Sequence, residues 1–379
     1  MKLLRLFTAA ALILLFVCPV YGDEVISDEL YNAADFDAEQ MLAAIPKEVL
    51  DKLPYGDVFS PEGFRESFSF EYFFGVVVNA LCDAMMPALK SLSSTLGLVL
   101  VASGLAALKN ILRSDSLVSL FEFVSGLCIM LSLYSTASGL VQSVSAYLIQ
   151  LSTLMYAAIP VMIGIGTAGG NLTSSTVSAN AMMLGVTFVE TLAAEGLFPV
   201  LQLCMGLSIA SGVGGGLKLG GISKLVRGLF TKILAFVSAA ISAVMTFQTS
   251  IASRADSLSM RAMKFAASSS IPVVGGIAGD AIGAVAESLA LVRGTVGWVG
   301  VIIIAVMTLP VTVEILLVRL GVILSETAAD ILGLDREKSL LGEMSGFLGF
   351  LAAVSIICGL MFVYGMALFA RSVTAISVR

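Results

Sequence analysis

The chain has 379 residues, of which 58% are hydrophobic and 13% charged, and its mean hydropathy is +1.00. This composition excludes a water-soluble protein and predicts an all-α, polytopic membrane protein. The chain contains no histidine, which excludes most catalytic triads and most transition-metal sites. We therefore expect no enzymatic activity, no cofactor and no bound metal.

The formal net charge of −6 comes from one short segment. Residues 23–71 contain 13 acidic and 3 basic residues, whereas the 308 residues that follow contain 14 acidic and 16 basic residues. The membrane body is therefore slightly basic, and its partner there is lipid. No part of the chain has the composition of a nucleic-acid-binding protein.

Residues 1–22 have the three parts of a secretory signal peptide. Lys2 and Arg5 form the charged end, residues 6–17 the apolar core, and residues 20–22 the cleavage site. An uncleaved membrane anchor is the alternative. In either case the acidic segment that follows is delivered outside the cytoplasm.

The acidic extracytoplasmic segment covers residues 23–89, and we expect amphipathic helices in it. Pro46 opens a short helix that Pro54 ends. Further on, apolar residues recur at helical spacing, which predicts a helix lying on the membrane surface: Phe70, Phe73, Phe74, Val77, Leu81 and Met85. The whole segment is either a tether or a docking site for an extracytoplasmic partner.

The polytopic membrane domain covers residues 90–379, and we expect about seven to nine transmembrane or re-entrant helices in it. Nine apolar segments lead to this number: 91–108, 117–138, 141–165, 178–195, 197–213, 233–251, 272–292, 295–324 and 345–370.

The placement of Lys and Arg predicts the topology of these segments. With the N-terminus outside and nine crossings, the basic residues 218–232 lie inside, the acidic loop 326–343 lies outside, and Arg371 lies inside. One loop does not fit the rule, because it places three basic residues outside: Arg254, Arg261 and Lys264.

Glycines precede Lys218 as in a phosphate-binding loop, but the Gly-Lys-Ser/Thr triplet is missing, so nucleotide binding is not predicted. An apolar stripe follows and predicts a basic interfacial helix on the cytoplasmic face. The helix is either an orientation signal only or also a docking site for a cytoplasmic partner. The candidate docking residues are Lys218, Lys224, Arg227 and Lys232.

The run IPVVGGIAGDAIGAVAESL (271–289) combines apolar residues with glycines and two acids. Small residues every four positions let a neighbouring helix approach closely. A carboxylate at the bilayer centre costs about 2.5–3.5 kcal/mol, so two on one side should face protein or water. Alternatively, the acids lie near the interface and solvate a helix end. The candidate inward-facing helix contains Pro272, Gly275, Gly276, Gly279, Asp280, Gly283 and Glu287.

Two further charges lie in one apolar run, Glu314 and Arg319. They are five residues apart, which is poor spacing for an ion pair within one helix. Arg319 is therefore expected to extend to the membrane surface or to pair with another helix.

The run KFAASSSIPVVGGIAGDAIGAVAESLALVRGTVG (264–297) resembles the signature region of stage III sporulation protein AE of endospore-forming bacteria. The resemblance extends to the order of signal peptide, short polar segment and glycine-rich membrane body. It implies a multi-pass protein of the mother-cell membrane around the forespore. It also implies a channel or secretion complex with ring-forming membrane proteins and a secretion-type ATPase.

By this resemblance the acidic segment faces the intermembrane space, and residues 218–232 face the mother-cell cytoplasm, where the ATPase docks. No catalytic or binding residue carries over from the family. The alternative function is a stand-alone secondary transporter, in which Asp280 and Glu287 bind a proton or a cation.

Overall fold

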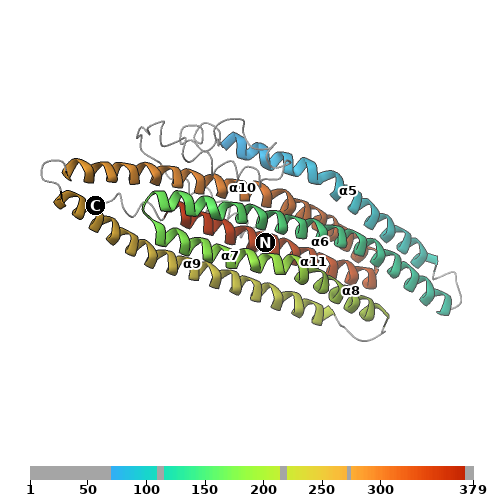
Figure 1. The fold of residues 1–379 in the computed structure, drawn as a ribbon. Coiled ribbons are helices and arrows are strands. Elements are labelled where there is room, and N and C mark those ends of the chain that lie inside the picture. The colour runs from blue at the N-terminus through green and yellow to red at the C-terminus, as the bar shows by residue number, and fades with distance from the viewer. Residues whose placement is uncertain (1–69, 109–114, 214–219, 271–274, 372–379) are drawn as a thin grey trace.

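The computed structural model describes residues 70–108, 115–213, 220–270 and 275–371 (Figure 1). The signal peptide predicted at residues 1–22 lies outside the described residues, as does most of the acidic segment. The described elements are α5 (Phe70–Leu108), α6 (Asp115–Ala168), α7 (Leu172–Thr191), the π-helical turn η1 (Leu192–Gly196), α8 (Leu197–Val213), α9 (Gly220–Ser270), α10 (Gly275–Ile331) and α11 (Asp335–Arg371).

The predicted all-helical class is confirmed. The described residues contain six helices long and apolar enough to cross a membrane, fewer than the seven to nine segments expected. The difference arises because three pairs of predicted apolar segments each join into one continuous span. In the sequence, the two members of each pair are separated only by a short gap, and these gaps contain Gly139, Gly196 and Gly294. One glycine inside a helix costs about 1 kcal/mol. The packing of long apolar helices outweighs this cost.

α5 runs beside α10 in the same direction. Val76 packs against Ile302, and farther along Thr95 Oγ1 and Ser325 Oγ are hydrogen-bonded at 2.8 Å. The first half of α5, expected to lie on the membrane surface, therefore packs on the bundle. The boundary predicted between residues 89 and 90 falls inside this helix.

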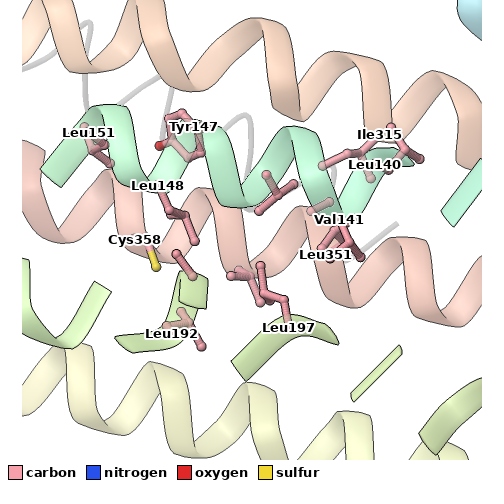
Figure 2. Close-up of a cluster of buried hydrophobic side chains, with 14 of the residues drawn as sticks. Leu140, Val141, Tyr147, Leu148, Leu151, Leu192, Leu197, Ile315, Leu351 and Cys358 are labelled. Atoms are coloured by element: carbon pink, nitrogen blue, oxygen red, sulfur yellow. The ribbon is translucent and has the colours of Figure 1, made fainter. Parts of the chain in front are cut away.

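α11 lies at the centre of the bundle (Figure 1). It contributes the largest fully buried side chains, Phe347, Phe362 and Phe369. Figure 2 shows the contact with α6, where Leu351 and Cys358 of α11 belong to the same buried cluster as the labelled α6 leucines. Dispersion contacts of this kind hold membrane helices together, because lipid tails are as apolar as leucine.

α9 and α11 run in the same direction, and α10 runs opposite to both. Arg227 pairs with Glu343 near the start of α9 and α11, and Thr246 Oγ1 lies 2.8 Å from the Tyr364 hydroxyl farther along. The start of α9 and residues 326–343 therefore lie at the same end of the bundle.

This arrangement corrects the topology expected from nine crossings. That topology placed residues 218–232 and the acidic loop 326–343 on opposite sides of the membrane. Only two helices, α9 and α10, separate the two regions, and two crossings return the chain to the end where it started. Arg371, the last residue of α11, lies at the other end of the bundle, away from Arg227.

α9 is an outer helix whose charges delimit a membrane-sized segment. Residues 233–253, between Lys232 and Arg254, form an uncharged run of 21 residues. At 1.5 Å per residue this run is about 32 Å long, close to the ~30 Å hydrocarbon core of a bilayer. Phe236 and Phe247 are 74% and 69% exposed on it. We expect these side chains to contact lipid.

A tight turn joins α6 to α7, and α9 caps the new helix. Gly170 has φ +74°, a conformation that favours glycine. Asn171 makes no side-chain cap bond. Instead, the buried carboxylate of Asp256 accepts hydrogen bonds from Thr173 N at 3.1 Å and Ser174 N at 2.7 Å. The negative charge also suits the positive end of the α7 dipole.

We expect Asp256→Ala to lower the free energy of unfolding by about 1–2 kcal/mol, because two backbone donors of α7 lose their cap. Thermal unfolding of the purified protein in detergent measures this. Ser257→Ala is the matched control, since the Ser257 hydroxyl donates to the Arg254 carbonyl of its own helix. Equal melting temperatures for the two variants would contradict a stabilising cap.

Candidate functional site

Charged side chains gather where the first turns of α11 meet α9 and α10. α9 and α11 both begin at this end and α10 ends there, so their polar termini meet. Acidic residues in the first turn of α11, Asp335 and Glu337, suit the positive end of its dipole. We call the following set the charged layer: Arg227, Arg319, Glu326, Arg336, Glu337 and Glu343.

A buried ion pair lies at the centre of the charged layer. Nη2 of Arg227 lies 2.7 Å from Oε2 of Glu343, and the two side chains are 8% and 20% exposed. Nη1 of Arg227 also donates to the backbone carbonyl of Glu343. Two hydrogen bonds thus fix the guanidinium to α11 and offset part of the cost of burying both charges.

Three glycines of α11 make room for charged side chains. Gly342, Gly346 and Gly349 are spaced four and three residues apart, so they share one helix face. At each of them an added Cβ would crowd a charged group of the layer: 3.0 Å from Glu326 Oε1 at Gly342, 3.0 Å from Arg227 Cζ at Gly346 and 2.9 Å from Arg319 Cζ at Gly349. Larger residues on this face would displace the charges.

The outer part of the layer contacts α6. Glu337 is only 5% exposed and accepts a hydrogen bond from Ser125 Oγ at 3.4 Å. The Cζ atom of Arg336 lies 6.0 Å from the ring centroid of Phe123, at the limit of a cation–π contact. Cys204 of α8 is buried beside Arg227. The layer therefore links α11 to every helix around it except α5 and α7.

The arrangement is suited to holding helices in register. Fixed opposite charges in a low-dielectric interior favour one alignment of α9 and α11, since sliding either helix separates the pair. Within the described ranges, no three His, Cys, Asp or Glu side chains lie close enough together to hold a metal ion.

Of the four candidate docking residues, two lie on the surface. Lys224 and Lys232 are exposed at the end of the bundle that carries the charged layer, and Lys218 lies outside the described residues. Arg227 instead points into the bundle and is 7% exposed, which corrects its placement on a docking surface.

There is a physical reason why Arg227 points into the bundle and not toward the surface. The apolar stripe of the predicted interfacial helix includes Leu225 and Leu229, which are 65% and 54% exposed. In a membrane the apolar face of a helix turns toward lipid and the polar face toward protein, opposite to the arrangement in water.

The candidate inward-facing helix is described only in its backbone. Gly275, Gly276, Gly279, Asp280, Gly283 and Glu287 lie in α10, and the structure describes the helix there but not these side chains. Pro272 lies outside the described residues. The inward-facing role of these residues stays a prediction.

Sequence reasoning missed the centre of the charged layer. Glu343 was assigned to an outer loop, and the glycines of α11 were not singled out. The spacing of Gly342, Gly346 and Gly349 could have revealed a close-contact face. Arg319, expected to extend to the surface or to pair with another helix, lies against that face at Gly349.

Six long apolar helices, two of them joined by an ion pair inside the bundle, define a polytopic helical membrane protein. The chain belongs to the stage III sporulation protein AE family, which it matches over residues 62–372, a range that includes all six helices. The family resemblance drawn from residues 264–297 is thereby confirmed. No curated protein and no solved structure matches the chain.

Proposed function

We propose that this stage III sporulation protein is a non-enzymatic membrane subunit of the complex that joins mother cell and forespore, in the mother-cell membrane around the forespore. The family match over residues 62–372 carries the proposal. In this role the chain is the large membrane component of a secretion or channel assembly.

Two exposed lysines at one end of the bundle support this role. Lys224 and Lys232 are exposed at the end with the charged layer, and a secretion-type ATPase binds there from the mother-cell cytoplasm. Residues 23–69 join the bundle through Phe70, at the start of α5. They face the intermembrane space, where ring-forming partners assemble.

Deletion of the gene in its source organism should abolish heat-resistant spores and leave vegetative growth normal. The wild-type chain should restore the spores. Lys224→Glu/Lys232→Glu should reach the membrane but restore few spores, because reversed charges repel the ATPase. A tagged copy purified after engulfment should then retain its membrane partners and lose the ATPase.

Lys338→Gln is the matched control, because Lys338 lies at the same end, is 41% exposed and pairs with Asp330 of its own protein. It should behave as wild type in both assays. Normal spore counts after deletion would overturn the sporulation role. Solute transport by the purified chain alone in vesicles, lost in Asp280→Asn/Glu287→Gln, would favour a stand-alone transporter.

A further inference from the structure

The last third of α9 presents a stripe of basic and apolar side chains. Arg254, Leu258 and Arg261 are spaced four and three residues apart, share one helix face, and are all exposed. Leu258 is 67% exposed. The nearby acid, Asp256, is buried at the start of α7. We call these three exposed residues the basic stripe.

The two arginines of the basic stripe are unusual in position and in pairing. Among the side chains that the structure describes, which do not include those of Asp280 and Glu287 in α10, neither forms an ion pair. They lie at the end of the bundle opposite Lys224, which by the predicted sidedness is outside the cytoplasm. Arginine is normally depleted there. An acidic partner on the same side of the membrane would neutralise these charges.

Contacts between helices show at what height along the bundle axis α5 begins. Val76 packs against Ile302, and Phe70 precedes Val76 by six residues on a helix parallel to α10. Gly297, five residues before Ile302, lies against Ala370 of α11. Phe70 is therefore close to the level of Ala370.

The basic stripe lies at the same level. Thr246 of α9 is hydrogen-bonded to Tyr364 of α11, and the two helices run in the same direction. Arg254 follows Thr246 by eight residues, and Ala370 follows Tyr364 by six. The chain that precedes Phe70 therefore starts near the level of Arg254.

The segment before Phe70 has the charge and the length to reach the stripe. Residues 23–71 contain 13 acidic and 3 basic residues, with apolar residues such as Leu42 and Val49 between the acids. A stretch of 47 residues extends to well over 100 Å at about 3.3 Å per residue. The three helices that the segment must span, α5, α10 and α9, are each about 10 Å across and together only about 30 Å wide.

We propose that the acidic N-terminal segment of this chain, residues 23–69, docks on the basic stripe of its own α9. Carboxylates of the segment pair with Arg254 and Arg261, and its apolar side chains cover Leu258. The contact neutralises the extracytoplasmic arginines. It also ties the segment across the bundle, from α5 to the far side of α10.

A photo-crosslinking residue at position 258 of the full-length protein, in native membranes, tests the contact. We expect a crosslink within one chain, and mass spectrometry should locate it in residues 23–69. The same residue at position 225, equally exposed at the other end of α9, should give no crosslink to this segment. Raising the salt from 50 mM to 500 mM should weaken the crosslink at position 258.

Charge reversal tests the pairing itself. Arg254→Glu/Arg261→Glu should lower the crosslink yield at least about fivefold, as expected for the loss of two exposed ion pairs. Asp35→Lys/Asp37→Lys/Glu39→Lys in the same chain should restore it. Lys224→Glu/Lys232→Glu, a reversal at the other end of the same helix, should leave the yield unchanged.

Three outcomes would overturn the proposal. These are crosslinks to lipid only, crosslinks between two copies of the chain, and a yield that neither salt nor charge reversal changes. Should the reversed variants fail to accumulate, the salt dependence and the position of the wild-type crosslink decide. None of these readouts depends on spore formation, so the contact is tested separately from the proposed function.

Discussion

Glu343→Ala is expected to lower the free energy of unfolding by about 3–5 kcal/mol, because it leaves the Arg227 guanidinium buried without its counter-charge. The pair lies at 2.7 Å with side-chain exposures of 8% and 20%, so water replaces the lost carboxylate only in part. Thermal unfolding of the purified protein in detergent measures the effect as a lowered melting temperature.

A second variant separates the lost charge from the lost contact. Replacement of both partners, Arg227→Met/Glu343→Leu, should recover most of the stability, since an apolar pair leaves no uncompensated charge. Lys338→Ala breaks an ion pair of the same 2.7 Å length, but its side chains are 41% and 55% exposed, so little change is expected. A double variant as unstable as Glu343→Ala would contradict this account.

Gly297→Ala is expected to destabilise the contact of α10 with α11 by about 1–3 kcal/mol. The added Cβ would lie 2.6 Å from Cβ, 3.0 Å from Cα and 3.1 Å from N of Ala370. Backbone atoms of a central helix cannot move aside as the end of a flexible side chain can. The two helices must therefore separate, which lowers the melting temperature in detergent.

Gly139→Ala is the matched control for this substitution. Gly139 also lies inside a helix, α6, but a Cβ there would meet nothing within 4 Å. Alanine has the higher helix propensity, so this variant should gain about 0.5–1 kcal/mol. If both variants moved the melting temperature in the same direction, close packing at Gly297 would not explain the result.

The fold class could be predicted from the sequence because apolar length alone distinguishes membrane helices. Their number could not, since Gly139, Gly196 and Gly294 each look like a break between segments. Whether a helix continues through a glycine depends on the neighbours that pack against it. No local pattern contains this information.

The charged layer was predictable only in part. The start of α9 is predicted as an amphipathic helix on the membrane surface, but periodicity does not say whether its basic face turns to water or to other helices. Arg227 was therefore placed on the wrong face. Its partner Glu343 is 116 residues away in the chain, and spacing within one helix cannot reveal such a pair. The spacing of the α11 glycines was a usable signal.

The ion pair also has a consequence for how the protein is made. The six helices form three successive hairpins. α5 pairs with α6, the span made of α7 and α8 pairs with α9, and α10 pairs with α11. Arg227 belongs to the second hairpin and Glu343 to the third, 116 residues later. At about 5–20 residues per second, the arginine is added to the chain roughly 6–23 s before its partner carboxylate is. The final alignment of the bundle is thus a late step of synthesis, completed only when the last hairpin enters the membrane.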